Sequence, residues 1–297
     1  MIKTVSVIGA GTMGNGIAHV FAQHGYLVNL VDLSKPQLDK AIATITKNLE
    51  RQLDKGLITE EIKARALSNI TTMTSFAGLK DSQLIVEAAT ENTELKLSIF
   101  KQIDEVAPEG CILASNTSSI SITKIAAATK RPEHVIGMHF MNPVPVMKLV
   151  EVINGYATKK EVTDTVVELS QKLNKVPCVV NDYPGFIANR ILMPMINEAI
   201  YSLYEGVADV KAIDTVMKLG MAHPMGPLQL ADFIGLDVCL SILDVLYKGF
   251  GNQKYAPCPL LVNMVTAGKL GVKSGEGFYN YATGSKELVV SNRFSIS

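Results

Sequence analysis

The sequence predicts an α/β fold, in which a Rossmann-type doubly wound parallel sheet is followed by a second, all-helical domain. A Gly-x-Gly-x-x-Gly motif at residues 9–14 directly follows a β-branched run. Short apolar runs then alternate with helical patterns, as in successive βαβ units. This alternation stops after residues 182–185, Asp-Tyr-Pro-Gly, where proline and glycine interrupt the chain. We therefore predict two domains, residues 1–183 and 184–297.

The first domain is predicted to contain short strands, bounded by turn residues, with helices between them. The predicted strands are residues 4–8, 28–31, 84–87, 112–115, 135–139, 150–153 and 178–181. The predicted helices are residues 14–24, 36–55, 59–67, 95–106 and 162–174. The helical insertion at 36–67 is not needed for a minimal mononucleotide-binding fold. We expect it to project from the sheet, where it could carry a substrate site.

The second domain shows helical spacing only. Its predicted helices are residues 186–204, 210–219, 228–247 and 260–267. Gly220 and Gly268 are stop signals, and Pro194 should bend the first of these helices. These apolar helices outnumber what one small domain can hide, which predicts a homodimer formed through this domain.

The amino-acid composition limits the kinds of partner that the protein is expected to bind. The 297 residues include 28 Lys plus Arg and 28 Asp plus Glu, so no basic field favours nucleic acid or an anionic membrane. Aspartates interrupt the apolar stretch 228–246, which argues against a membrane span, and residues 1–9 read as a strand, not a secretory signal. Four scattered cysteines without a Cys-x-x-Cys pair predict a reducing, cytoplasmic setting and no metal.

The glycine motif predicts an NAD site. Gly9, Gly11 and Gly14 allow a tight turn and close approach of a pyrophosphate, while Thr12 and Met13 open the helix whose N-terminus attracts anions. Asp32 ends the second strand, where its carboxylate would accept hydrogen bonds from the adenosine ribose and repel the extra phosphate of NADP. The alternative is a glycine turn that binds no ligand.

His139 and Glu151 lie inside apolar, strand-like runs, where both are costly to bury without a partner. If they meet, the carboxylate can orient the imidazole and stabilise its cation, as a general base requires. The alternative is a hydrogen-bonded core histidine without a catalytic role.

Several blocks of sequence together resemble the L-3-hydroxyacyl-CoA dehydrogenases, and among them the bacterial 3-hydroxybutyryl-CoA dehydrogenases. The resemblance runs from Met1 to Tyr281. The matching blocks are Ala114–Ser119, His139–Pro143, Lys148–Val152, Pro184–Arg190, His223–Pro227 and Lys273–Tyr279.

The resemblance implies catalytic roles for specific residues. His139 would be the general base, Glu151 its orienting carboxylate, and Ser118 and Asn189 polar groups around the reacting carbon. Without the resemblance, Ser118 reads equally well as a cap for the helix near Ser121. Asn189 reads as an amide at the domain interface.

The resemblance also implies binding roles. Glu91, Lys96, Asn116, Asn142 and Lys273 match positions near the cofactor. The substrate-contacting arm of the family matches the helix after Asp32, with Asn48 and Lys55 at the relevant positions. Asn48 stands where a family member has serine, and charged residues such as Glu91, Lys96 and Lys55 are often only solvated on a helix surface.

The implied function is an NAD-dependent oxidoreductase that moves a hydride between C3 of an acyl-CoA substrate and the nicotinamide. Two alternatives stay open. One is a dehydrogenase of a free hydroxy acid, although such enzymes place a lysine at the centre of the site. The other is a non-catalytic NAD-binding protein that resembles lens lambda-crystallin.

Overall fold

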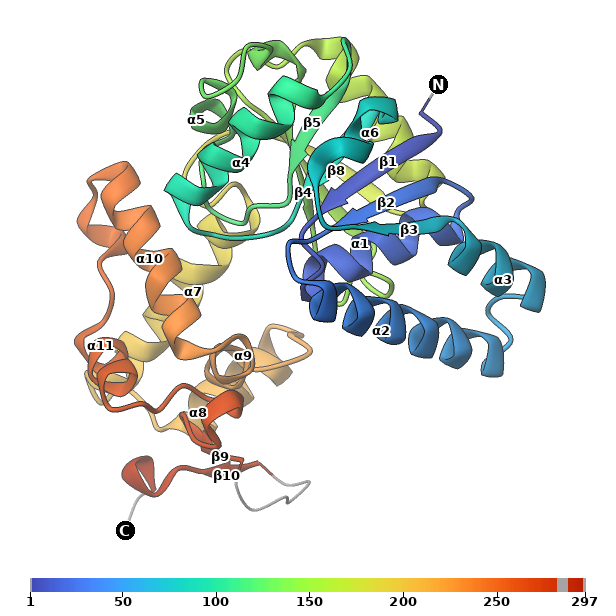
Figure 1. Ribbon diagram of the computed structural model, residues 1–297. Coiled ribbons are helices and arrows are strands. Elements are labelled where there is room, and N and C mark those ends of the chain that lie inside the picture. The colour runs from blue at the N-terminus through green and yellow to red at the C-terminus, as the bar shows by residue number, and fades with distance from the viewer. Residues whose placement is uncertain (1, 282–287, 296–297) are drawn as a thin grey trace. The chain divides into compact units, whose positions relative to one another are not determined.

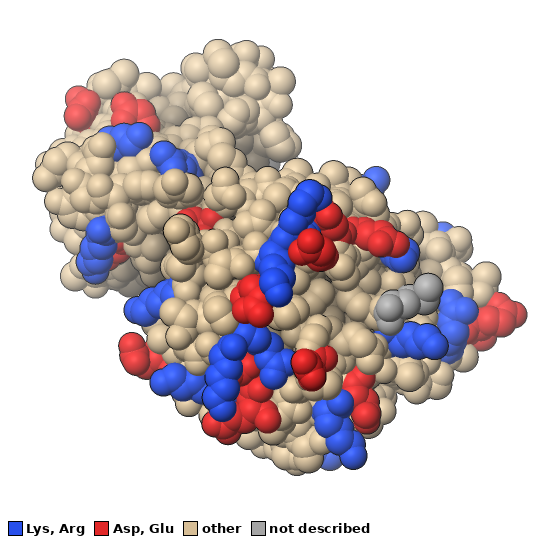
Figure 2. Space-filling model, turned by 90° about the horizontal axis from the view of Figure 1, so that it is seen from above, with Lys and Arg blue, Asp and Glu red and all other residues tan. Residues whose placement is uncertain are grey.

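The computed structural model describes residues 2–281 and 288–295. Contacts divide the chain into two compact units, Met1–Tyr183 and Pro184–Ser297 (Figure 1). Within the described residues, no helix has the length and apolar character needed to cross a membrane. On the face in Figure 2, acidic and basic side chains are interspersed.

The first unit is built on one twisted sheet in the order β3-β2-β1-β4-β5-β6-β7-β8. All neighbouring strands pair in parallel except β6 and β7, which are antiparallel. The strands are β1 Thr4–Ile8, β2 Leu27–Val31, β3 Ile70–Met73, β4 Leu84–Glu87, β5 Ile112–Ser115, β6 Val135–Phe140, β7 Leu149–Asn154 and β8 Val176–Asn181.

Two features of the sheet differ from the prediction. The polar edge strand β3, Ile70–Met73, was missed, because two threonines dilute its apolar pattern. The sheet is not wholly parallel, because residues 141–148 between β6 and β7 are too few for a helical crossover, so the chain returns antiparallel. That reversal sets His139 directly opposite Glu151.

The insertion forms two helices, α2 and α3, which extend beyond the sheet on the side of β2 and β3 (Figure 1). Leu38, Ala41, Ile45 and Leu49 recur at helical spacing and are fully buried, so α2 attaches by one apolar stripe. The helices of this unit are α1 Thr12–Gln23, α2 Lys35–Asp54, α3 Glu60–Ser68, α4 Thr93–Val106, α5 Ile122–Ala126 and α6 Lys160–Lys172, with short turns η1 Phe76–Asp81 and η2 Pro132–His134.

The second unit has its own apolar core and is mainly helical. Its helices are α7 Ala188–Tyr204, α8 Val210–Thr215, α9 Pro227–Ile234, α10 Leu236–Phe250 and α11 Pro259–Thr266, with short turns η3 Val216–Gly220, η4 Gln253–Tyr255, η5 Val272–Ser274 and η6 Asn292–Phe294. The predicted helix 228–247 is two helices, because Gly235 adopts a φ of 103° between them. A two-stranded hairpin, β9 Tyr279–Asn280 and β10 Val289–Val290, also departs from the all-helical prediction.

Two buried aspartates organise this unit. Asp214 accepts hydrogen bonds from the backbone N–H groups of Leu228 and Gln229, at 2.8 and 3.0 Å, at the start of α9. Asp232 accepts from the N–H groups of Phe278 and Tyr279, at 3.0 and 2.9 Å. Each carboxylate therefore joins segments that are distant in the sequence.

Asp232 should make stability depend on pH. Burial raises its carboxyl pKa to about 6, against the opposing effect of its hydrogen bonds. The folded state thus binds this proton more tightly than the unfolded state, and the associated stability is full below about pH 4 and is lost as the pH rises through 6. We expect wild type to lose roughly 2 kcal/mol of unfolding free energy relative to Asp232→Asn between pH 4.5 and 7.5. Urea unfolding of both proteins at each pH measures this difference. A wild type that gained stability relative to the variant would show that the hydrogen bonds outweigh desolvation.

Candidate functional site

The glycine motif forms the turn between β1 and α1. Gly9 has a φ of 96°, and a Cβ atom there would lie 2.6 Å from the Cα of Ala89. A Cβ on Gly14 would lie 1.7 Å from the carbonyl oxygen of Gly9. A Cβ on Gly11, by contrast, would meet nothing within 4 Å. The first and last glycines are required by the protein itself, whereas Gly11 leaves open space beside the α1 N-terminus, as a bound phosphate requires.

Asp32 fixes this turn. Its Oδ2 accepts a hydrogen bond from the Ala10 N–H at 2.8 Å, and its Oδ1 accepts from the Ser34 N–H at 2.9 Å. The carboxylate thereby joins the end of β2 to the glycine turn after β1. Asp32 thus lies beside the motif, and its contact with an adenosine ribose stays a prediction.

A cavity of about 300 Å³ opens at the carboxyl ends of β1, β4 and β5. Ligands bind at this edge in open α/β sheets. Six predicted cofactor residues line it together with Ala88, Ala89 and Thr90: Gly11, Thr12, Met13, Glu91, Lys96 and Asn116. The cavity, the open space at Gly11 and the α1 N-terminus fit a dinucleotide with an anionic pyrophosphate.

Lys96 is less exposed than the sequence suggests. Its side chain is 1% exposed, and its ammonium pairs with the carboxylate of Glu87. Glu87 also accepts hydrogen bonds from the Ser115 hydroxyl at 3.0 Å and the Ala89 N–H at 2.9 Å. Sequence analysis missed Glu87 and Ser115. The sequence contained a signal for Glu87, because a carboxylate at the end of the apolar run of β4 is costly to bury without a partner.

Glu91 organises the loop after β5. Its carboxylate accepts hydrogen bonds from the Thr117 hydroxyl at 2.7 Å and from the Ser118 N–H at 2.7 Å. The Ser118 hydroxyl also donates to Glu91, at 3.2 Å. Glu91 is therefore not simply a solvated charge on a helix. Ser121, not Ser118, caps α5 by accepting from the Lys124 N–H at 3.1 Å.

His139 and Glu151 meet, as predicted. They are cross-strand neighbours in the β6–β7 pair, and His139 Nδ1 lies 2.8 Å from Glu151 Oε2. The His139 side chain is 12% exposed and that of Glu151 is 1% exposed. A buried carboxylate at Nδ1 favours a proton on that nitrogen, so Nε2 is the ring nitrogen that can accept another proton. Asn116 fixes the end of the same strand by accepting from the Phe140 N–H at 2.8 Å.

A second cavity, of about 230 Å³, lies between α1, α2 and the loop after β6. Asn142 and Asn48 both line it, with Thr12, Lys40 and Thr44. Thr12 lines both cavities, whereas Asn142 lines only the second one. Lys55 is the exposed C-terminal cap of α2 and lines neither cavity.

The remaining predicted site residues belong to the second unit. Asn189 is the second residue of α7. Lys273 lies in η5 and donates a hydrogen bond to Asp237 at 2.6 Å. No cluster of metal-ligating side chains occurs among the residues that the structure describes.

Comparison with known proteins matches the two units to the two domains of one protein family. Residues 4–183 match the NAD-binding domain of 3-hydroxyacyl-CoA dehydrogenase, and residues 185–281 match its C-terminal domain. The chain is 56% identical to a 3-hydroxybutyryl-CoA dehydrogenase of Bradyrhizobium diazoefficiens, over 95% of this chain and 96% of that protein. It is 52% identical to a probable 3-hydroxybutyryl-CoA dehydrogenase of Bacillus subtilis, over 94% and 98%.

A solved structure extends the match to three dimensions. The (S)-3-hydroxybutyryl-CoA dehydrogenase of Ralstonia eutropha superposes with a TM-score of 0.93 at 52% identity, over 95% of this chain and 99% of that one. The match covers both domains and nearly the whole length of each chain. The chain therefore belongs to the 3-hydroxyacyl-CoA dehydrogenase family, with an NAD-binding Rossmann-type domain and a helical C-terminal domain.

Proposed function

We propose that the protein interconverts (S)-3-hydroxyacyl-CoA and 3-oxoacyl-CoA with NAD, and that 3-hydroxybutyryl-CoA is its substrate. The observation that carries this proposal is the His139–Glu151 pair, at 2.8 Å, in a chain with the two domains of this family. A secondary alcohol releases hydride readily only as its proton leaves, so the reaction needs a base of this kind. The relatives' names indicate the four-carbon substrate.

The protein's own groups would handle the proton. In the oxidising direction His139 accepts the hydroxyl proton at Nε2, and Glu151 stabilises the imidazolium that forms. In the reducing direction the same cation returns a proton to the forming alkoxide. Ser118 and Asn189 would donate hydrogen bonds to the substrate oxygen. The Ser118 hydroxyl would turn from Glu91 to the substrate, while the bond from the Ser118 N–H to Glu91 would hold the residue in place. NAD, when bound, supplies the hydride acceptor.

Cofactor binding is assigned mainly to the first unit. Gly9 and Gly14 shape the turn, while Gly11, Thr12 and Met13 would face the pyrophosphate at the α1 N-terminus. Asp32 would accept from the adenosine ribose. The other proposed contacts are Glu91, Lys96, Asn116, Asn142 and, from the second unit, Lys273. The ion pairs of Lys96 with Glu87 and of Lys273 with Asp237 suggest that both lysines act mainly by holding neighbouring groups.

The coenzyme A portion is assigned to the α2 arm. Lys40 and Asn48 line the cavity of about 230 Å³ on the face of α2 toward α1, and an ammonium there suits a phosphate. Lys55 lies at the end of the same helix and would act through its charge at longer range.

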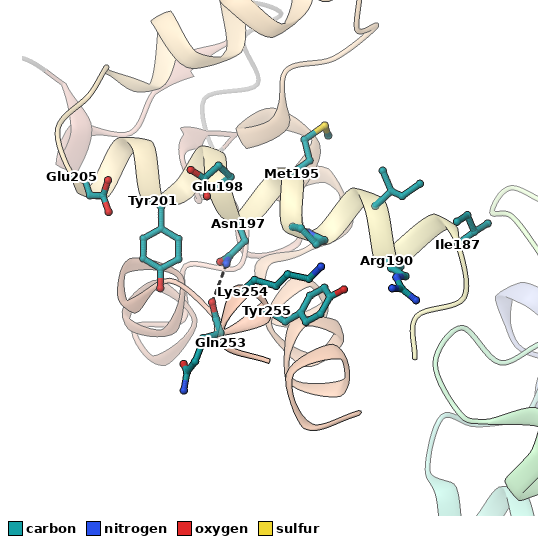
Figure 3. Close-up of a pocket in the computed structure, with 13 residues that line it drawn as sticks. Ile187, Arg190, Met195, Asn197, Glu198, Tyr201, Glu205, Gln253, Lys254 and Tyr255 are labelled. Carbon is teal, nitrogen blue, oxygen red and sulfur yellow. Dashed lines mark hydrogen bonds between the residues drawn. The ribbon is translucent and has the colours of Figure 1, made fainter. Parts of the chain in front are cut away.

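We also propose a homodimer through the second unit. Arg190 lies near one end of a cavity along α7, Glu205 lies near the other end, and Lys254 lies between them (Figure 3). None of these three has an ion pair among the described residues. If α7 packs antiparallel on its copy about its middle, Arg190 of one copy faces Glu205 of the other. Such a contact would also cover Ile191 and Tyr204, which are 63% and 55% exposed.

A cytoplasmic location is the last part of the proposal. The four cysteines are free thiols, and Cys178 among them is exposed. Exposed free thiols suit a reducing compartment. Cell fractionation followed by immunodetection checks it, and recovery outside the cytoplasmic fraction would contradict it.

The first prediction about function concerns the His–Glu pair. His139→Asn should lower kcat by at least about 10², because it removes the base while leaving the cofactor cavity intact. Glu151→Gln should have a similar effect, and the double variant should lose little more than either single variant, because the two residues act as a unit. Steady-state kinetics and NADH titration measure both quantities.

The matched control for this prediction is His134→Asn, which breaks a more exposed pair with Glu133 and should leave kcat unchanged. Losses that multiply in the double variant would contradict a coupled pair. A folded wild type that binds NADH without turnover would favour the non-catalytic alternative.

The second prediction concerns substrate class. Acetoacetyl-CoA should be reduced far better than free acetoacetate, because binding of the CoA portion positions the reacting carbonyl. Lys55→Glu should raise the KM for acetoacetyl-CoA while sparing that for NADH, with an effect that shrinks at high ionic strength. Lys101→Glu, on the exposed face of α4, is the control. Equal efficiency with the free acid would instead favour a hydroxy-acid dehydrogenase.

The third prediction concerns the dimer. Arg190→Glu and Glu205→Arg should each weaken association by at least about tenfold, since each places like charges opposite one another. The double variant should recover most of the affinity, because the pair is then exchanged. Sedimentation velocity over a concentration series measures this. Single variants that associate like wild type would place the interface elsewhere.

A further inference from the structure

Lys175 carries a buried charge that the proposed chemistry does not use. The residue is 7% exposed, and it lies between α6 and β8. Asn174 before it adopts a left-handed φ of 56°, which ends the helix and turns the chain. The Lys175 N–H then donates to the Ser170 carbonyl at 3.0 Å. The backbone conformation thus fixes where the lysine stem begins.

The ammonium of Lys175 binds backbone carbonyls. It donates to the carbonyl oxygens of Val144 and Met147, at 2.5 and 2.7 Å. Within the described chain, it forms no ion pair with a carboxylate. Burial accordingly lowers the pKa of Lys175. A buried cation without a counter-ion is costly, so an apolar side chain would serve mere packing better.

The two carbonyls belong to residues 141–148, the loop that joins the His139 strand to the Glu151 strand. Within the loop, the N–H groups of Val146 and Met147 both donate to the Pro143 carbonyl at 2.9 Å. Among the described residues, the Val144 and Met147 carbonyls accept no hydrogen bond except those from Lys175. The ammonium therefore supplies the partners that the buried side of this loop lacks.

The same loop packs against the glycine-rich segment. Val144 is 2% exposed, and its Cβ would lie only 2.9 Å from a Cβ on Gly16 of α1. Asn142 and Thr12, the first residue of α1, both line the cavity of about 230 Å³. A change in the position of the loop would therefore alter both this cavity and the support of the glycine turn.

We propose that Lys175 is a positioning residue, whose ammonium holds the 141–148 loop against α1 so that Asn142 and the glycine-rich turn are placed for NAD and the acyl-CoA. The reacting pair is held differently, by the backbone register of β6 and β7. Removal of the ammonium should thus weaken ligand binding and leave the chemical step nearly intact. The acyl-CoA part of this inference rests on the proposed function.

The experiment compares Lys175→Met with Lys172→Met, which removes an exposed lysine at the end of α6. Fluorescence titration gives the Kd for NADH, steady-state kinetics give kcat and KM, and urea unfolding reports stability. For Lys175→Met we expect the Kd for NADH and the KM for acetoacetyl-CoA to rise at least about fivefold, with kcat within about threefold of wild type. Lys172→Met should match wild type in all of these.

Two further variants test the proposal if Lys175→Met does not fold. Lys175→Arg keeps the charge and should retain most of the NADH affinity. Lys175→Gln has a shorter, neutral donor, and it should raise the Kd for NADH and the KM for acetoacetyl-CoA with little change in kcat, as Lys175→Met does. A wild-type Kd for NADH in a folded Lys175→Gln or Lys175→Met would overturn the proposal. So would a fall in kcat with unchanged Kd and KM.

The NADH titration also separates this inference from the proposed function. It needs no acyl-CoA, so an incorrect substrate assignment would appear as absent turnover in wild type and leave the effect of Lys175 on NADH binding measurable.

Discussion

The short connection between β6 and β7 is the constraint on which the arrangement of the site depends. Residues 141–148 cannot hold a crossover helix, so β7 must run antiparallel to β6. In that register His139 lies directly opposite Glu151, and a buried carboxylate meets an imidazole nitrogen at 2.8 Å. The pair is therefore positioned by backbone hydrogen bonds of the sheet. Such positioning suits proton transfer, which is sensitive to small displacements.

Charged side chains hold the first unit together in three ways. Asp32 ties the end of β2 to the glycine turn, and Glu87 pairs with Lys96 beneath the proposed cofactor cavity. Lys175 binds carbonyls of the loop after β6. Glu87, Lys96 and Lys175 cost free energy to bury, and each is matched by hydrogen bonds or an ion pair. All three link a strand end or loop at the carboxyl edge of the sheet to its surroundings.

In the second unit, two buried carboxylates hold other elements by accepting hydrogen bonds from their backbone N–H groups. Asp214 holds the start of α9, and Asp232 holds the chain before β9. These contacts stabilise a small helical unit that carries Asn189 at its first helix. In the proposed function, the second unit presents the Asn189 amide to the substrate. It also forms the proposed interface between copies.

The sequence by itself determined the features that depend on local physics. The glycine motif, the helix stripes and the break at residues 182–185 follow from spacing and backbone conformation. They were enough to predict the Rossmann-type first domain and an all-helical second one, to which the β9–β10 hairpin is the exception. The family resemblance added roles for residues that no spacing rule could provide, and those roles stay predictions.

Only the tertiary structure decided which polar groups meet. Glu87 and Lys96 are close enough in sequence to suspect, but Asp232 and Tyr279, or Lys175 and Val144, are distant along the chain and pair only because the fold brings them together. The same holds for the break at Gly235, whose φ of 103° is one of several conformations open to a glycine in an apolar stretch. Packing determines which distant residues come into contact, and the spacing of residues along the chain does not specify how the elements pack.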